Sequence, residues 1–303
     1  MKKIMVLIMS LMSLMSLGAE TKDYTQYKSK VLVSPSVAKE VIEKEKNVVV
    51  VDVTSKSKYM IGHIKGSYNM WRPDMEPKDG RYGDVKGMRA SREELEKELS
   101  QMGINNDSTI VLLGDNLDEY RLWWIMDLYG AEKMKIVDGG YTALKEAGVK
   151  TKMGREPGVK KGNYKFPKVA DKDTLITFET LKKSLDNKEI VILDTRSLKE
   201  NNGTELKKGA FVKGKIPGSV WVEWSKTLDK NKKMKPYNEL VNLYTKAGVV
   251  DSKEIIAYCQ SAVRSAHTTF VLKELLGYKN VKNYDGSWIE WSYQASKNNA
   301  PIK

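Results

Sequence analysis

The fold is decided by a short run that occurs twice, as VVVVDV at residues 48–53 and as IVILDT at residues 190–195. Each run is rich in β-branched residues and reaches an Asp, which is typical of a buried strand in a parallel sheet. A glycine-bounded motif follows each run, GHIKGS at 62–67 and GKIPGS at 214–219. The chain therefore contains an internal repeat.

The two copies also match in the segments that follow. Each contains an amphipathic helical segment, a strand, a second helix, and a short strand with a turn, at 91–104, 108–113, 120–130 and 134–141 in the first copy and at 237–250, 254–258, 264–277 and 281–288 in the second. Strands that alternate with helices predict an α/β fold, a mostly parallel sheet with helices on both faces, in each copy.

The length of 303 residues also suits two domains. We expect the first domain to span residues 20–150 and the second to span residues 173–303. The segment 151–172 between them is rich in Lys, Gly and Pro, and it is interpreted as a linker.

The first nineteen residues have the pattern of a secretory signal peptide. Lys2 and Lys3 are followed by a mostly apolar run over 4–17 and by the small pair Gly18 and Ala19. The apolar run is too short to span a bilayer comfortably, although a retained membrane anchor remains an alternative. We therefore predict a periplasmic or secreted protein with no membrane association after signal removal.

Composition excludes several function classes. The formal net charge is +13, but the lysines are spread along both halves, so we interpret them as a solvated surface that attracts small anions and expect no nucleic-acid partner. The chain has one cysteine, so an intramolecular disulfide cannot form. The chain contains no Cys/His cluster with the spacing of metal ligands and no glycine-rich nucleotide-binding loop. We therefore expect no metal and no cofactor.

Cys259 is the candidate nucleophile. It follows the predicted strand at 254–258 and precedes a predicted helix, which is where open α/β sheets place their chemistry. The loop CQSAVRS (259–265) can direct several backbone N–H groups at one point, and the helix N-terminus and Arg264 add positive charge. All three favour the thiolate, although a buried inert cysteine is the alternative. His63 and His267 are interpreted as structural, so no Cys–His pair is expected.

In this order, VDV…GHIKGS, LDTRS…GKIPGS, CQSAVRS and YDGSWIEW resemble the two-domain rhodanese family, the thiosulfate and 3-mercaptopyruvate sulfurtransferases. The resemblance covers nearly the whole mature chain. It implies that Cys259 carries sulfur as a persulfide, that thiosulfate donates it, and that cyanide or a thiol accepts it. 3-Mercaptopyruvate remains the alternative donor.

The resemblance also assigns site residues. Cys259 matches the nucleophile, and the loop that cradles the persulfide corresponds to Gln260, Ser261, Ala262, Val263 and Arg264. Arg196, within LDTRS, matches the arginine that helps to hold the anionic donor, with a surface salt bridge as the alternative. Ala262 stands where the family usually has Gly, which leaves donor choice open.

The first copy matches the silent domain of the family. It has no cysteine, and Thr54 stands in the position of Arg196. We expect this copy to cover the cleft and an apolar face of the second copy. Asp52 and Asp194 are expected to hold backbone or loop groups at strand ends, while Trp288 and Trp291 either wall the cleft or pack in a core.

Two other functions are weighed. A phosphatase loop has five residues between Cys and Arg, whereas four separate Cys259 from Arg264, and this smaller ring suits a single sulfur atom. A non-catalytic binding module is disfavoured because both Cys259 and Arg264 are kept. We expect the protein to act as a monomer.

Overall fold

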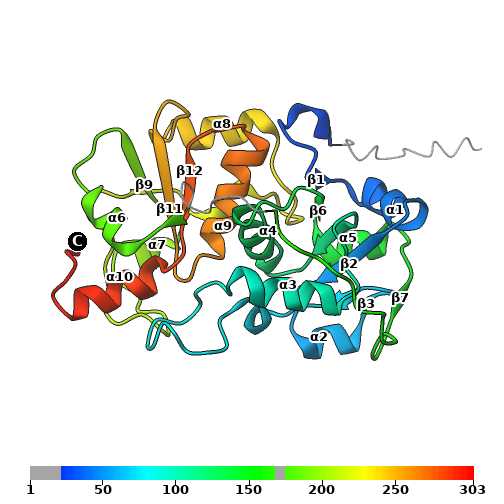
Figure 1. Ribbon diagram of the computed structural model, residues 1–303. Helices are drawn as coiled ribbons and strands as arrows, with labels where there is room; N and C mark the ends of the chain where they lie inside the picture. Colours follow the sequence, from blue (N-terminus) through cyan, green and yellow to red (C-terminus); the bar gives the residue numbers. More distant parts are fainter. Residues whose placement is uncertain (1–21, 168–174) are drawn as a thin grey trace, which may run out of the picture.

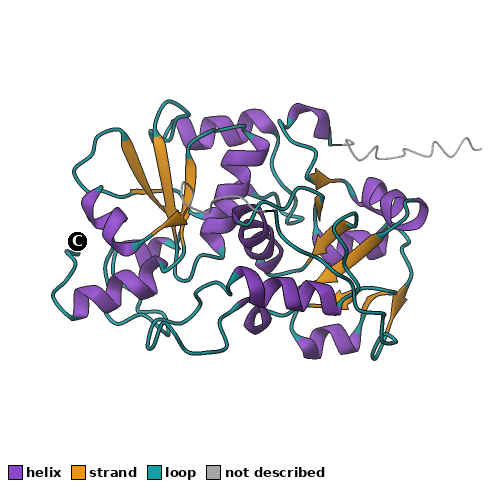
Figure 2. Ribbon diagram, viewed as in Figure 1, coloured by secondary structure: helices purple, strands orange, loops and turns teal. Residues whose placement is uncertain are grey.

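The computed structural model describes residues 22–167 and 175–303, and it contains two similar α/β domains (Figure 1, Figure 2). The signal peptide expected at residues 1–19 lies outside the described residues. Among the residues that are described, no helix has both the length and the apolar character needed to cross a bilayer.

Each domain is built on a five-stranded parallel sheet. The first sheet has the order β1-β6-β5-β2-β4 and the second has the order β8-β12-β11-β9-β10, so that the strands match one for one. The strands of the first sheet, in chain order, are β1 Leu32–Val33, β2 Val48–Asp52, β4 Tyr68–Asn69, β5 Thr109–Leu113 and β6 Met134–Val137. Those of the second are β8 Leu175–Ile176, β9 Ile190–Asp194, β10 Val220–Trp221, β11 Glu254–Tyr258 and β12 Val281–Tyr284.

Helices cover both faces of each sheet (Figure 2). In the first domain they are α1 Pro35–Lys44, α2 Lys56–Ile61, α3 Arg92–Gln101, α4 Asp118–Leu128 and α5 Gly140–Glu146, with short 3-10 turns at Tyr24–Gln26 and Arg72–Met75. In the second they are α6 Phe178–Lys183, α7 Leu198–Asn201, α8 Tyr237–Thr245, α9 Arg264–Phe270 and α10 Ser287–Ser296, with a 3-10 turn at Trp224–Thr227 and a π-helical turn at Val271–Leu275. The predicted fold class is confirmed.

The segment expected to be a linker is packed against the first domain over its first part. β7 (Thr151–Lys152) pairs with β3 (His63–Ile64) in a small antiparallel sheet. Farther along, the buried rings of Tyr164 and Phe166 lie 5.1 Å apart, and Phe166 also contacts the ring of Tyr129. The alternation of aromatic and polar residues in NYKF explains this burial, so the first domain's packing extends past the predicted boundary at 150.

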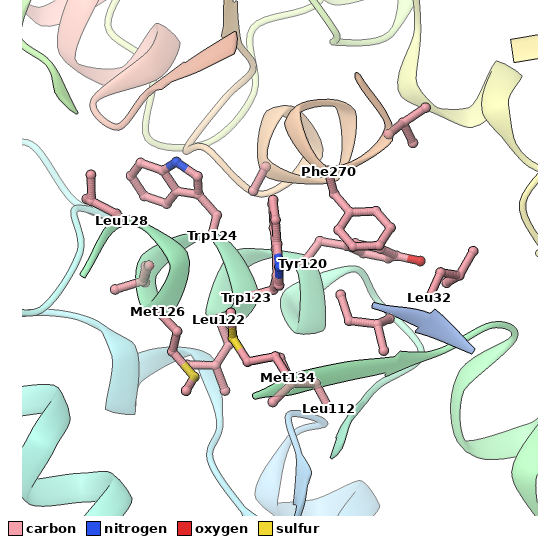
Figure 3. Packing of buried hydrophobic residues seen from close by; sticks show 14 of the residues in the cluster. Leu32, Leu112, Tyr120, Leu122, Trp123, Trp124, Met126, Leu128, Met134 and Phe270 are labelled. Carbon is pink, nitrogen blue, oxygen red and sulfur yellow. The ribbon is translucent and has the colours of Figure 1, made fainter. Parts of the chain in front are cut away.

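The two domains share a hydrophobic core where α4 packs against α9 (Figure 1). Figure 3 shows Tyr120 and Trp123 of α4 beside Phe270 of α9, with ring centroids 5.1 and 4.9 Å apart. These rings are buried and meet edge to face, an arrangement that adds to the free energy gained by burial. The first domain therefore covers an apolar face of the second, as expected.

Candidate active site

Cys259 lies directly after the last residue of β11, the middle strand of the second sheet, and α9 begins five residues later. Its side chain is buried, with 1 % of its surface exposed. Parallel strands end at one edge of the sheet, where helix N-termini gather, so the topology places the thiol where partial positive charge accumulates.

Ser287 holds the loop in a tight turn. Its Oγ accepts hydrogen bonds from the backbone N–H groups of Cys259 and Ala262, at 3.2 and 3.1 Å, and donates to the carbonyl of Tyr284 at 2.9 Å. Ala262 has a φ of 55°, in the left-handed region that favours glycine. Ser287 lies within the motif YDGSWIEW, and this role was not predicted from the sequence.

The loop carbonyls are occupied by groups outside the turn. The backbone N–H of Trp288 donates to the carbonyl of Cys259 at 2.9 Å, and the backbone N–H of Ile289 donates to that of Gln260 at 3.0 Å. With these carbonyls held on the outside, N–H groups of the loop can face the sulfur.

The first domain supplies two arginines to the same loop. Arg72 donates to the carbonyl of Ser261 at 2.9 Å and to its Oγ at 3.2 Å. Arg121 of α4 is buried, lies 3.4 Å from the carbonyl of Ala262, and forms an ion pair of 2.7 Å with Asp285. Residues of both domains therefore stabilise the conformation of the loop.

The pKa of the Cys259 thiol lies below its ordinary value. Burial is the largest single effect and raises the pKa, but the combined opposing effects are stronger. They come from the positive charge of Arg264, from the hydroxyl and backbone N–H of Ser265, and from the backbone N–H of Ser261. The loop thus stabilises a negative charge on the sulfur.

Arg264 is held by a carboxylate that was not predicted from the sequence. Glu200 of α7 accepts two hydrogen bonds from its guanidinium, at 2.6 and 2.8 Å. Burial opposes ionisation of Glu200, but its bonds to Arg264 and Ser197 are stronger and lower its pKa to about 2. Arg264 also interacts with the sulfur of Cys259, so Glu200 orients the cation beside the thiol.

Arg196 forms a buried ion pair beside β9. It is buried, its Nε and Nη2 donate to the carboxylate of Asp194, and Nη2 also donates to the carbonyl of Gly214 at 2.9 Å. Its guanidinium lies 4.5 Å from the ring centroid of Trp288. Of the three guanidinium nitrogens of Arg196, only Nη1 has no hydrogen-bond partner among the described residues. The structure therefore shows a scaffolding ion pair, and contact with a donor stays a prediction.

Other expected residues have structural contacts. Asp52 accepts from the backbone N–H and hydroxyl of Thr54, and Asp194 binds Arg196, which confirms their place at strand ends. Trp288 and Trp291 are buried in the core of the second domain.

Neither histidine is hydrogen-bonded to the thiol within the described part of the chain. His63 is stacked on Tyr59 and contacts the carboxylate of Glu156 at 3.2 Å. His267 is buried, and desolvation lowers its pKa to about 3, so its imidazole is neutral at physiological pH. The structural interpretation of both agrees with these contacts.

The first domain contains a counterpart of the cysteine loop without the cysteine. Asp52 pairs with Leu113 in the first sheet as Asp194 pairs with Tyr258 in the second. Gly114 therefore takes the position of Cys259. Counting onward, Leu117, with a φ of 72°, corresponds to Ala262, and Glu119 corresponds to Arg264.

A cavity of about 350 Å³ lies between the two loops. It is lined from the first domain by Gly114, Asp115, Asn116, Leu117, Glu119, Tyr120, Val137, Gly139 and Gly140, and from the second by Trp224, Leu228, Lys232, Val263 and Arg264. Cys259 is not among the lining residues. Arg264 connects the cavity to the thiol, because it lines the first and interacts with the second.

Comparison with known proteins agrees with this architecture. A family model described as a rhodanese-like domain matches residues 34–147 and 177–294. A protein of Mycolicibacterium smegmatis named "Putative thiosulfate sulfurtransferase" is 33% identical over 274 residues, which cover 87% of this chain and 95% of that protein. "Sulfur carrier protein TtuD" of Thermus thermophilus is 33% identical over 244 residues, covering 77% of this chain and 83% of that protein.

A solved structure is also similar in fold. The anaerobic ergothioneine biosynthesis enzyme from Chlorobium limicola, in complex with its natural substrate trimethyl histidine, matches with a TM-score of 0.75 and 22% identity. The match covers 90% of this chain and 70% of that chain. At this identity the likeness concerns the fold alone.

Proposed function

The chain belongs to the rhodanese family with two tandem domains, and we propose that it transfers sulfane sulfur from thiosulfate through a persulfide on Cys259. That it is a sulfurtransferase follows from the family and from relatives at about a third identity. The donor, the persulfide and the residue roles are the proposal.

One observation carries the mechanism. The thiol of Cys259 has a lowered pKa inside a turn where the N–H groups of Ser261 and Ser265 and the charge of Arg264 stabilise negative sulfur. The thiolate is the nucleophilic form of cysteine. A thiolate attached to such a turn can attack sulfur and then hold an anionic persulfide on the same donors.

The first half-reaction is a displacement at sulfur. The Cys259 thiolate attacks the outer sulfur of thiosulfate, the new S–S bond forms, and the S–S bond of thiosulfate breaks. The electron pair of the broken bond leaves with sulfite. The products are the ionised persulfide of Cys259 and sulfite, so charge and atoms balance without an added proton.

In the second half-reaction an acceptor takes the outer sulfur. Cyanide attacks this sulfur, the persulfide S–S bond breaks, and its electron pair returns to Cys259 as the thiolate. Thiocyanate leaves, and the enzyme regains its starting state. The loop binds a sulfur anion at every stage, and we therefore assign Gln260, Ser261, Ala262, Val263 and Arg264 to it as the persulfide cradle.

Intact-mass measurement after incubation with thiosulfate tests the proposal. We expect the mass of one sulfur atom to be added to the wild type, removed by cyanide, and absent in Cys259→Ser. Absence of the added mass in the wild type would support a non-catalytic binding module instead. Release of sulfite from thiosulfate, compared with release of pyruvate from 3-mercaptopyruvate at equal concentration, identifies the preferred donor.

We further propose that the protein is exported and acts as a monomer. The basic, apolar and small-residue pattern of residues 1–19 supports the proposed export. Expression of the full chain, fractionation of the cells, and N-terminal sequencing should recover a mature chain from the exported fraction. Recovery of uncleaved protein from the membrane would support a retained anchor, and size-exclusion chromatography with light scattering measures the oligomeric state.

A further inference from the structure

Glu119 is a buried carboxyl that the proposed mechanism does not use. Its side chain belongs to α4 and lines the cavity between the domains, yet only 7% of the residue is exposed. Its Oε2 is buried and has no hydrogen-bond partner among the described residues. An unpartnered buried carboxyl oxygen costs free energy, so its presence at a cavity wall points to a ligand that would satisfy it.

The missing cysteine of the first domain makes room for this carboxyl. A Cβ atom at Gly114 would lie 2.5 Å from Oε2 of Glu119, so the Glu119 side chain could keep its present position only beside a glycine. The position that holds the nucleophile in the second domain is therefore occupied in the first by a carboxyl from the position of Arg264. The silent loop has a carboxyl group where the active loop has a guanidinium group.

Burial and neighbouring carboxylates, rather than a cation, set the pKa of Glu119. Burial is the main reason that its pKa is raised to about 8, and the carboxylates of Asp118, Asp115 and Asp52 raise it further. Asp115 lines the same cavity and is exposed to it. A cationic group placed between Asp115 and Glu119 would offset both the free-energy cost of ionising the buried Glu119 carboxyl and the repulsion between the two carboxylates.

The two walls of the cavity carry different ionisable groups. The carboxyls of Asp115 and Glu119 lie on the first-domain wall, while Lys232 and Arg264 lie on the second-domain wall. The other lining side chains are mostly apolar and include Leu117, Tyr120, Trp224 and Leu228. The volume of about 350 Å³ falls within the range of small-molecule sites and greatly exceeds the size of cyanide or thiosulfate.

We propose that this cavity binds the physiological sulfur acceptor, and that the acceptor is a small organic thiol with an ammonium group held by Glu119 and Asp115. The inference rests on the proposed function, because it requires a persulfide at Cys259. Arg264 joins the cavity to Cys259, so a thiol anchored at the acidic wall can extend toward the sulfur-bearing loop.

The transfer step balances without an outside reagent. The acceptor sulfur bonds to the outer sulfur of the Cys259 persulfide, and the bond between the two persulfide sulfurs breaks. The electron pair of that bond returns to Cys259 as the thiolate, and the acceptor leaves as its own persulfide carrying the proton that its thiol brought. A divalent metal is not the expected occupant, because the described residues contain no group of three or more metal-ligating side chains.

The test compares two probe acceptors, cysteinylglycine and N-acetylcysteinylglycine, which differ only at the amino group. With thiosulfate as donor, kcat/KM for each is measured in the wild type, Glu119→Gln and Asp115→Asn. We expect each substitution to lower kcat/KM for cysteinylglycine about tenfold or more, and that for the acetylated probe about threefold or less, because only the first loses a charged hydrogen bond. Glu146→Gln, an exposed change on α5, is the matched control and should leave the ratio of the two constants unchanged.

Three outcomes decide between the ideas. A ratio that falls in both cavity variants supports the inference, and Asp115→Asn provides the answer at an exposed position even if Glu119→Gln were to fold poorly. An unchanged ratio, in a protein that still forms the persulfide and turns over with cyanide, overturns the inference and leaves the proposed function intact. Absence of a persulfide from the wild type overturns the proposed function, and with it this inference.

Discussion

Replacement of Glu200 by Gln removes the charge that holds Arg264 beside the thiol while keeping the shape of the side chain. Glu200 is buried, and its two hydrogen bonds to Arg264 measure 2.6 and 2.8 Å. Loss of its charge leaves a largely buried guanidinium without its counter-ion, which is a strongly destabilising change.

The size of the effect follows from the pKa of Glu200. A fall from an ordinary 4.5 to about 2 corresponds to about 3 kcal/mol of stability at neutral pH. Because the Arg264 side chain is 16% exposed, screening by solvent reduces this to about 2–3 kcal/mol. The pKa is lower in the folded chain than in the unfolded chain. The stabilisation is therefore complete above about pH 4.5 and is lost as the pH falls toward 2.

Urea unfolding of the wild type and Glu200→Gln at pH 7 and pH 3 measures this difference. We expect the variant to be less stable by about 2–3 kcal/mol at pH 7 and by roughly 1 kcal/mol at pH 3. Glu239→Gln is the control, since its ion pair with Lys235 is long, at 3.8 Å, and its side chain is 59% exposed. A difference for Glu200→Gln that is the same at both pH values would refute the reasoning.

Four further changes test the site. Arg264→Ala should raise the pH midpoint of Cys259 alkylation, because a positive charge that lowers the thiol pKa is removed; an unchanged midpoint would assign the effect to the loop N–H groups alone. Ser287→Ala should lower the free energy of unfolding by about 1–3 kcal/mol, because two buried N–H groups lose their acceptor, and chemical denaturation checks this. Ala262→Gly should raise the free energy of unfolding by about 1 kcal/mol, and with it the melting temperature, since the φ of 55° at this position favours glycine; a melting temperature below that of the wild type would argue against backbone strain. Arg196→Ala should cost about 3–5 kcal/mol in urea unfolding because it leaves a buried carboxylate unpaired, and an unchanged stability with a raised KM for thiosulfate would restore the donor-binding role.

Much of the fold could be read from the chain because strand and helix patterns are local. The runs at 48–53 and 190–195 became β2 and β9, and the position of Cys259 after β11 was correct. The packing of the segment after residue 150 could not be predicted in this way. Tyr164 and Phe166 are separated from α3 by many residues, and no local pattern shows which domain would bury their rings.

The sequence by itself determined the two repeated α/β units, the single thiol at the end of a strand, and the loop of N–H groups and Arg264 around it. These features depend on residue order over short distances, where backbone geometry leaves few alternatives. Only the tertiary structure decided that Glu200 holds Arg264 and that Asp194 accepts hydrogen bonds from Nε and Nη2 of Arg196. It also decided that Oε2 of Glu119 has no hydrogen-bond partner among the described residues. The physical reason is that the partner of a buried charged side chain is the group that folding brings within hydrogen-bond distance, away from water. Glu200 and Arg264 are 64 residues apart in the chain, so their pairing depends on how the strands are ordered in the sheet.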